Sequence, residues 1–320
     1  MLAPRERPCY AAFTSTMPKT IRYARLPTEQ QHPRSRHLDQ LSIPALLTLV
    51  HREDAQALRA VTNALPHIAR AVRLVTTALS REGRLFFVGA GTSGRLGVLE
   101  AAECPPTFHT PPSMIQAIIA GGRGAVFRSR EGAEDRRAKA SRVIRQRIRV
   151  GDVVVGIAAS GVTPFVDEAL LTATRRGAQT ILITCHTRSP IRAHVRIILP
   201  VGPEILTGST RLKAGTATKL VLNMLTLGAM VQLGKTYGNL MVDVRPTSKK
   251  LHARGRQIIQ TVTGCSDQAA ARYLRAAHGH VKTAIVMATH RISYQDAQRQ
   301  LTRANGVLRR ALHLERTRKR

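Results

Sequence analysis

The chain has 320 residues, 43% of them hydrophobic, and carries 50 Lys and Arg against 19 Asp and Glu, a formal net charge of +31. This length and apolar content allow about two domains and exclude wholesale disorder. No apolar run approaches the roughly 20 residues that a membrane-spanning helix needs. Four scattered cysteines, with no CxxC pair and no metal-ligand spacing to histidine, exclude a zinc pattern and a disulfide framework. We therefore expect a protein of the cytoplasm with reduced thiols and no membrane partner.

The excess of basic residues attracts polyanions, and nucleic acid is the first such partner to consider. Aromatic residues make up only 3% and tryptophan is absent, so platforms for base stacking are scarce. A nucleic-acid-binding protein stays open as an alternative and predicts tight, steeply salt-dependent DNA binding. Because the basic residues are dispersed, densest at 123–149 and 316–320, we expect only weak, non-specific polyanion binding.

The N-terminal region divides into a tail and a helical arm. Residues 1–26 are arginine-rich, nearly free of acids and without an apolar core segment, so they are no secretory signal. They resemble an organelle transit peptide, and a disordered basic tail or a true start at Met17 also explains them. Apolar residues then recur at helical spacing from Leu38 to Leu79, which predicts a helical arm within 27–80, kinked or divided at Pro66.

Short β-rich runs and helical stretches alternate in the central region. The predicted strands are 84–88, 114–119, 152–157, 180–184 and 196–199. The predicted helices are 96–103, 134–147, 164–174 and 212–233. This alternation predicts an α/β domain over 81–250, with a parallel sheet flanked by helices. Helical patterns continue after Pro246, with a capped break at 263–266, and predict a small helical module over 251–320.

The first chemical motif is Gly-Ala-Gly-Thr-Ser-Gly at 89–94, between a predicted strand and a predicted helix. It matches the dinucleotide fingerprint G-x-G-x-x-G. A nicotinamide site also needs an acid about 20 residues further on, where this chain has Gly-Gly-Arg at 121–123. We therefore interpret the loop as a site for a single phosphate, bound by Gly91, Thr92 and Ser93 at the helix N-terminus.

Two further loops carry hydroxyl groups. Ser160 and Thr163 lie in the loop that joins the third predicted strand to the following helix. Loops at the carboxyl ends of parallel strands meet in one crevice, so both loops point to a phosphorylated small molecule, although each also fits a simple capping turn. A third cluster at 206–219 opens a helix, and there we expect Ser209 and Thr210 to contact the ligand.

These motifs resemble those of the N-acetylmuramic acid 6-phosphate etherases, from about residue 28 to 312. The matching segments are 89–97, 103–107, 131–135, 152–164, 207–219 and 237–243. The resemblance implies a sugar isomerase (SIS) domain, a C-terminal helical, UBA-like module, a homodimer, and no metal or organic cofactor. It also implies a lyase of cell-wall amino sugar recycling, which releases D-lactate from the 6-phosphate sugar and leaves N-acetylglucosamine 6-phosphate.

The resemblance singles out two carboxylates. Eliminating lactate needs a base for the C2 hydrogen and an acid for the ether oxygen. Glu103 is the candidate acid, expected in the last turn of a helix that ends at Cys104, where the dipole and Glu100 favour protonation. Glu134 is the candidate base, although its residue type and position equally fit an acid in the first turn of a helix.

Some positions depart from the family pattern: Val162 where arginine is common, Arg123 after two glycines, and His109 in place of a small residue. We expect activity to survive, with substrate affinity affected. His109 and His186 lie near the loops, and we expect both at the surface. A second alternative is a non-catalytic sugar-phosphate sensor, similar to glucokinase regulatory proteins, which are longer and have two such domains.

Overall fold

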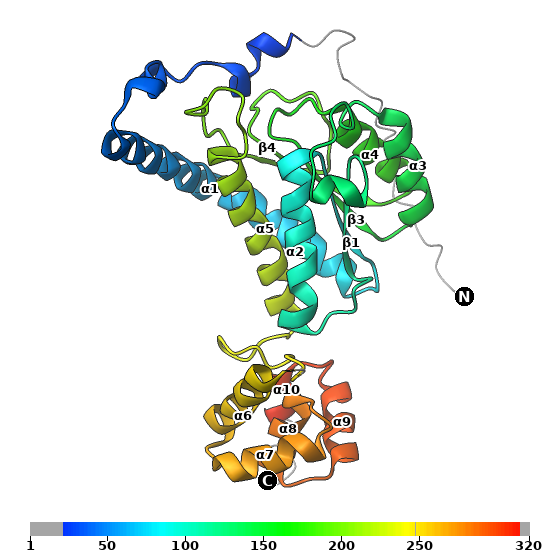
Figure 1. Cartoon of the computed structure of the whole chain (residues 1–320). Helices are drawn as coiled ribbons and strands as arrows, with labels where there is room; N and C mark the ends of the chain where they lie inside the picture. Colours follow the sequence, from blue (N-terminus) through cyan, green and yellow to red (C-terminus); the bar gives the residue numbers. More distant parts are fainter. Residues whose placement is uncertain (1–21, 247, 314–320) are drawn as a thin grey trace, which may run out of the picture. The chain divides into compact units, whose positions relative to one another are not determined.

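The computed structural model describes residues 22–246 and 248–313 (Figure 1). The chain forms two compact units. The first comprises Met1–Ala102 and Ser113–Leu225, and the second comprises Glu103–Pro112 and Thr226–Arg320. The second unit therefore begins before the boundary at 251 that the sequence suggested, and it includes a short segment from the middle of the chain.

The N-terminal arm begins with short 3-10 helices and continues into one long helix. The short helices are Tyr23–Arg25, Pro27–Glu29, Pro33–Ser35 and Leu38–Gln40. Leu26 is only 6% exposed, so the tail predicted at 1–26 is too long at its C-terminal end, while residues 1–21 lie outside the described part. Helix α1 (Ile43–Leu79) continues through Pro66, and the predicted division there is wrong. The helix buries a stripe of small and branched residues from Ala57 to Val75. The free energy of this burial offsets the loss of the one backbone hydrogen bond that proline removes.

The sheet confirms the predicted parallel α/β architecture. Its strands are β1 (Leu85–Gly89), β2 (Ile115–Ile119), β3 (Val153–Ile157), β4 (Gln179–Thr184) and β5 (Val195–Ile198). All are parallel, in the order β2-β1-β3-β4-β5. Because β2 and β3 lie on opposite sides of β1, the order reverses beside β1, and open α/β sheets bind ligands at such a switch point.

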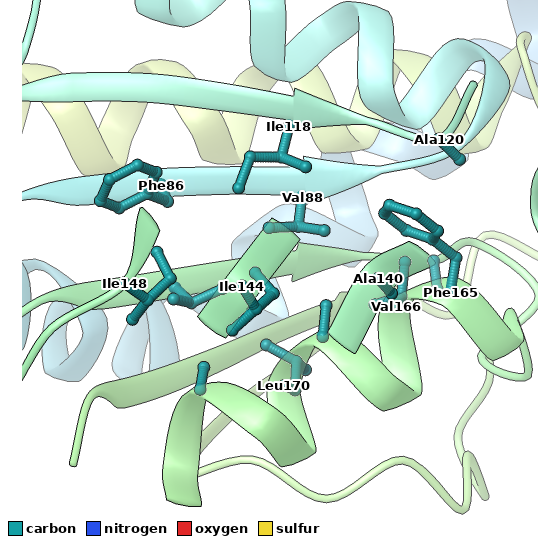
Figure 2. Close-up of a cluster of buried hydrophobic side chains, with 14 of the residues drawn as sticks. Phe86, Val88, Ile118, Ala120, Ala140, Ile144, Ile148, Phe165, Val166 and Leu170 are labelled. Carbon is teal, nitrogen blue, oxygen red and sulfur yellow. The ribbon is translucent and has the colours of Figure 1, made fainter. Parts of the chain in front are cut away.

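Helices pack on the sheet and enclose the core of the first unit. They include α2 (Gly91–Phe108), α3 (Arg137–Arg147), α4 (Pro164–Arg175) and α5 (Lys213–Gln232). Figure 2 shows Phe86 and Val88 of β1 packed against Ile144 of α3 and Leu170 of α4, each at most 1% exposed. The apolar runs of the strands are buried in this way, as expected for a parallel sheet.

Three helix boundaries differ from those expected by more than one residue. Helix α2 begins at Gly91, five residues before the predicted start at 96. Helix α2 runs five residues past Glu103 and includes Pro105 and Pro106, so the predicted end at Cys104 is wrong. The backbone N–H of His109 donates to the carbonyl of Pro105 at 2.9 Å and closes the last turn. In this hydrogen bond proline acts as the acceptor, so the missing N–H of proline does not matter there. Helix α3 begins at Arg137, so Glu134 lies in the preceding turn and not in the first turn of a helix.

The second unit contains the predicted C-terminal helices. They are α6 (Lys249–Thr263), α7 (Asp267–Ala276), α8 (Val281–His290), α9 (Tyr294–Arg303) and α10 (Leu308–His313). The predicted break between α6 and α7 is confirmed. Gly264 ends α6 with φ 72°, and the hydroxyl of Ser266 caps α7 by accepting from the N–H of Ala269 at 3.3 Å.

Among the described residues, one helix is long and apolar enough to cross a membrane by length and composition alone. It is α5, in which a stretch of 18 residues has a mean hydropathy of 1.2. Of this stretch, 56% is buried inside the protein. A helix buried in the core of a folded domain can have the same length and composition, and α5 is buried in this way.

Candidate functional site

The loop between β1 and α2 brings backbone amides to the switch point of the sheet. A Cβ on Gly89 would stand 2.7 Å from the backbone nitrogen of Gly94, so only glycine allows this close turn. Gly91 begins α2 with φ 53°, and Thr92 and Ser93 follow in the first turn. The first amides of a helix have no partner within it, so this end can bind an anion.

The loop between β3 and α4 presents two hydroxyl groups beside the first loop. Thr163 precedes α4 without capping it through its side chain, so the capping explanation does not account for its hydroxyl. The hydroxyls of Ser160 and Thr163 lie 3.5 Å apart. Gly161 has φ 70°, and a Cβ there would stand 2.7 Å from that of His186. The loop is therefore tightly built, and both of these hydroxyl-bearing residues line a pocket.

The third loop is fixed by a buried carboxylate. Glu204, fully buried, accepts hydrogen bonds from the backbone N–H groups of Lys213 at 3.1 Å and Ala214 at 2.9 Å. It caps α5 in this way, while burial raises the pKa of its carboxyl. The hydroxyls of Ser209 and Thr210 are thus not needed to begin the helix.

One pocket of about 240 Å³ gathers much of the predicted site. The predicted residues that line it are Ser93, Ser160, Thr163, Thr210 and Glu134. Gly91 and Glu134 line an adjoining cavity of about 50 Å³, whereas Thr92 and Ser209 line neither. Among the described residues that line the larger pocket there is no lysine or arginine. An anion in it would depend on hydroxyl groups and helix N-termini.

The N-terminal segment also contributes to this pocket, which the sequence did not predict. Tyr23, Thr28 and Glu29 also line the larger pocket. The N–H of Gly208 donates to the carbonyl of Thr28 at 3.1 Å and joins this segment to the third loop. No helical or strand pattern marks this segment in the sequence. The one feature that could have pointed to it is the family resemblance, which begins near Thr28.

Glu134 is held at the pocket by its backbone. Its carbonyl accepts from the N–H of Phe165, in the first turn of α4, at 2.9 Å. Although the residue as a whole is exposed, partial burial of its carboxyl raises the pKa of Glu134, and the negative charges of Asp135 and Glu131 raise it further. A carboxylate with a raised pKa next to a ligand pocket is suited to proton transfer.

Glu103 does not line the pocket that contains Glu134. It lies on α2 ten residues beyond Ser93, which is about 15 Å along the helix axis. Its side chain is exposed.

The departures from the family pattern lie in different surroundings. Val162 is 4% exposed and lines the larger pocket, where it adds apolar surface in place of a cation. Arg123 is exposed and lines neither cavity. His109 is exposed as expected, whereas His186 is half-buried.

Residues 139–228 match the SIS domain, and residues 67–174 match the glucokinase regulatory protein N-terminal SIS domain. A similar solved structure is a phosphoheptose isomerase from Francisella tularensis, with 17% identity and a TM-score of 0.47, covering 60% of this chain and 100% of that one. Together with the parallel sheet, the domain matches define an SIS-domain protein.

Relatives along nearly the whole chain narrow this class. An N-acetylmuramic acid 6-phosphate etherase from a Picosynechococcus strain is 50% identical over 288 residues, 89% of this chain and 96% of the relative. Etherases of the same name from Salinibacter ruber and Geobacillus thermodenitrificans are 49% and 48% identical, over 90% of this chain and 94% and 98% of theirs. The chain belongs to the N-acetylmuramic acid 6-phosphate etherase family.

Proposed function

We propose that the protein is a carbon–oxygen lyase that converts N-acetylmuramic acid 6-phosphate and water into N-acetylglucosamine 6-phosphate and D-lactate. The observation that carries the proposal is the pocket that Glu134 lines together with hydroxyl-bearing residues from three loops. The hydroxyls and the N-termini of α2 and α4 bind the phosphate, and the carboxylate lies within the same pocket. The reaction belongs to cell-wall amino sugar catabolism in the cytoplasm, and within the described part of the chain Cys104, Cys185 and Cys265 form no disulfide, as expected of that compartment.

The chemistry needs two proton transfers in each direction. In the open-chain sugar, Glu134 removes the C2 hydrogen, which the neighbouring aldehyde makes acidic. The bond between C3 and the ether oxygen then breaks, and Glu103 donates the proton with which lactate leaves. Water adds at C3 with its proton returning to Glu103, and Glu134 returns a proton to C2. Atoms balance, and no redox step is involved.

The position of Glu103 leads to a proposal about assembly. Since α2 carries it about 15 Å from Ser93, we propose that the protein acts as a homodimer in which Glu103 of the partner subunit reaches the pocket formed around Glu134. Each site then consists of residues from both chains, and the monomer lacks the acid.

The test is D-lactate release from N-acetylmuramic acid 6-phosphate by the purified protein. We expect turnover, with solvent deuterium entering C2 of the product. Binding of the sugar phosphate without any lactate would reject the lyase and leave the non-catalytic sensor, which the match to the glucokinase regulatory protein domain supports. The 48–50% identity to etherases over 94–98% of their length favours the enzyme.

The raised pKa of Glu134 gives a prediction for pH dependence. A base must be deprotonated, so kcat/KM falls on the acid side as Glu134 becomes protonated. Replacing Asp135 by asparagine removes a neighbouring negative charge that contributes to this raised pKa. We expect the acid limb of the kcat/KM profile to move to lower pH. Glu82→Gln, at an exposed position that does not line the pocket, is the control and should leave the limb in place.

Removing one hydroxyl group tests the phosphate site. Ser160→Ala deletes a hydroxyl that lines the pocket. A hydrogen bond to a charged group contributes about 1.5–3 kcal/mol, so we expect KM to rise about 10- to 100-fold with a smaller change in kcat. Ser113→Ala removes a hydroxyl that does not line the pocket and should leave KM unchanged. An unaltered KM in Ser160→Ala would mean that the phosphate binds elsewhere.

A further inference from the structure

The second unit contains a cavity of its own, of about 250 Å³. Every residue that lines it belongs to that unit. The walls come from the start of α8, from α9, from the segment 242–245, and from His109 and Lys235. This volume lies below the lower limit of about 300 Å³ for drug-sized ligand sites. The cavity is therefore suited to a small molecule.

Charge in this cavity is strongly unbalanced. Three cations line it, Lys235, Arg245 and Lys282, against the single carboxylate of Asp243. Asp243 pairs with Lys235 and with Lys282, each at 2.9 Å. Arg245 is exposed and forms no ion pair with any described residue. With neutral histidines the lining keeps a formal charge of +2, which a dianion would balance.

The groups around this excess charge are those that bind phosphate. No described side chain caps α8, and its first residues, Val281, Lys282 and Thr283, line the cavity. Helix α8 has ten residues, so its N-terminus offers free N–H groups and a partial positive charge. A guanidinium group adds a planar pair of donors that matches phosphate oxygens.

Burial and positive charge act together on the groups that line this cavity. Partial burial and the nearby charge of Arg245 lower the pKa of His109. The rings of His109 and His280 lie 6.2 Å apart, and both residues line the cavity. Burial also lowers the pKa of Lys282, even though Asp243 stabilises its charge. Positive groups are thus crowded together here, and an anion would relieve that crowding.

We propose that this cavity is a binding site for a small phosphate monoester, with the phosphate held by Arg245, Lys235 and the N-terminus of α8. Gln298 and Thr283 also line the cavity, joined by a hydrogen bond of 2.9 Å, and they offer polar groups to the ester's alcohol part. The small volume favours such a molecule over a nucleic acid, which needs an extended basic surface. This site is separate from the pocket around Glu134 and does not depend on the proposed reaction.

The experiment is a titration of the full-length protein with inorganic phosphate, followed by the NMR signals of the His109 and His280 rings. Sodium chloride at equal ionic strength is the reference. We expect saturable shifts of both signals with phosphate and much smaller shifts with chloride. Arg245→Gln, a change at an exposed position, should weaken binding at least about tenfold, since about 1.4 kcal/mol corresponds to one such factor.

Two controls make the result specific. Arg275→Gln removes an exposed cation of α7 that does not line the cavity, and it should leave the titration unchanged. Ser160→Ala weakens the other pocket, and the histidine response should persist in it. Equal shifts with chloride, no shift at all, or an unchanged titration in Arg245→Gln would each overturn the proposal.

Discussion

Glu103→Gln is expected to lower kcat for D-lactate release by about 10²–10⁴-fold, the usual range for loss of a general acid or base. Glutamine keeps the shape of the side chain and cannot donate the proton with which lactate leaves. Because Glu103 is exposed on α2, the variant should fold as the parent does, and urea unfolding would verify this. Glu134→Gln should show a loss of similar size for the other proton transfer.

Mixing the two inactive variants tests where the acid comes from. If each site combines Glu134 of one chain with Glu103 of its partner subunit, a dimer with one chain of each variant has one intact site. Random exchange makes half of the dimers mixed, so activity should return to about a quarter of the parent's. If both carboxylates acted within one chain, every site would lack one of them and the mixture would stay inactive. Glu82→Gln mixed with Glu134→Gln should keep about half of the parent's activity whether or not the chains exchange, and this value is the reference for the recovered quarter.

The sequence allowed most of the sheet to be predicted. Each predicted strand differs from the observed one by at most one residue at either end, for instance 152–157 against Val153–Ile157. Buried parallel strands are nearly continuous apolar runs bounded by polar turns, and that signal is local. Two of the helix boundaries that were wrong lie at Pro66 and at Pro105–Pro106, where burial and closure of the last turn outweigh the local preference of proline.

The candidate site was predictable only in part. Hydroxyl-bearing loops at strand ends identified Ser93, Ser160 and Thr163, because the topology of a parallel sheet brings such loops together. Glu134 was found by resemblance, since a turn ahead of α3 has no distinctive pattern. Glu103 was also found by resemblance, and it lies on α2 about 15 Å along the helix axis from Ser93. The contribution of Tyr23 and Thr28 is a long-range contact with no local signal.

The second large effect is on stability. Glu53 of α1 is 2% exposed and accepts from Nζ of Lys213 at 2.7 Å, and Lys213 is itself 2% exposed. His32 lies 3.1 Å from the same carboxylate, and Arg34 pairs with it as well. Removing one partner of a buried ion pair costs about 3–5 kcal/mol. We expect Glu53→Gln to lower the free energy of unfolding by that amount, measured by urea denaturation.

Two comparisons identify the ion pair as the cause. Replacing both Glu53 and Lys213 by methionine removes the two charges together, so the double variant should be more stable than Glu53→Gln. Glu82→Gln, an equal change at an exposed position, should alter the free energy of unfolding by less than about 0.5 kcal/mol. If Glu53→Gln lowers the free energy of unfolding no more than Glu82→Gln does, then water, and not Glu53, compensates the charge of Lys213.

The loss should also depend on pH. Burial alone would raise the pKa of Glu53, but the hydrogen bond and charge of Lys213, with His32 and Arg34, hold it below the ordinary 4.5. A carboxyl group with a lowered folded pKa stabilises the protein above its unfolded pKa, and this contribution disappears as the pH falls through the folded value. The difference between parent and Glu53→Gln should therefore be constant near neutral pH and shrink below about pH 4.5. Since Lys213 begins α5 directly after the loop that carries Thr210, the same ion pair holds one wall of the pocket in place.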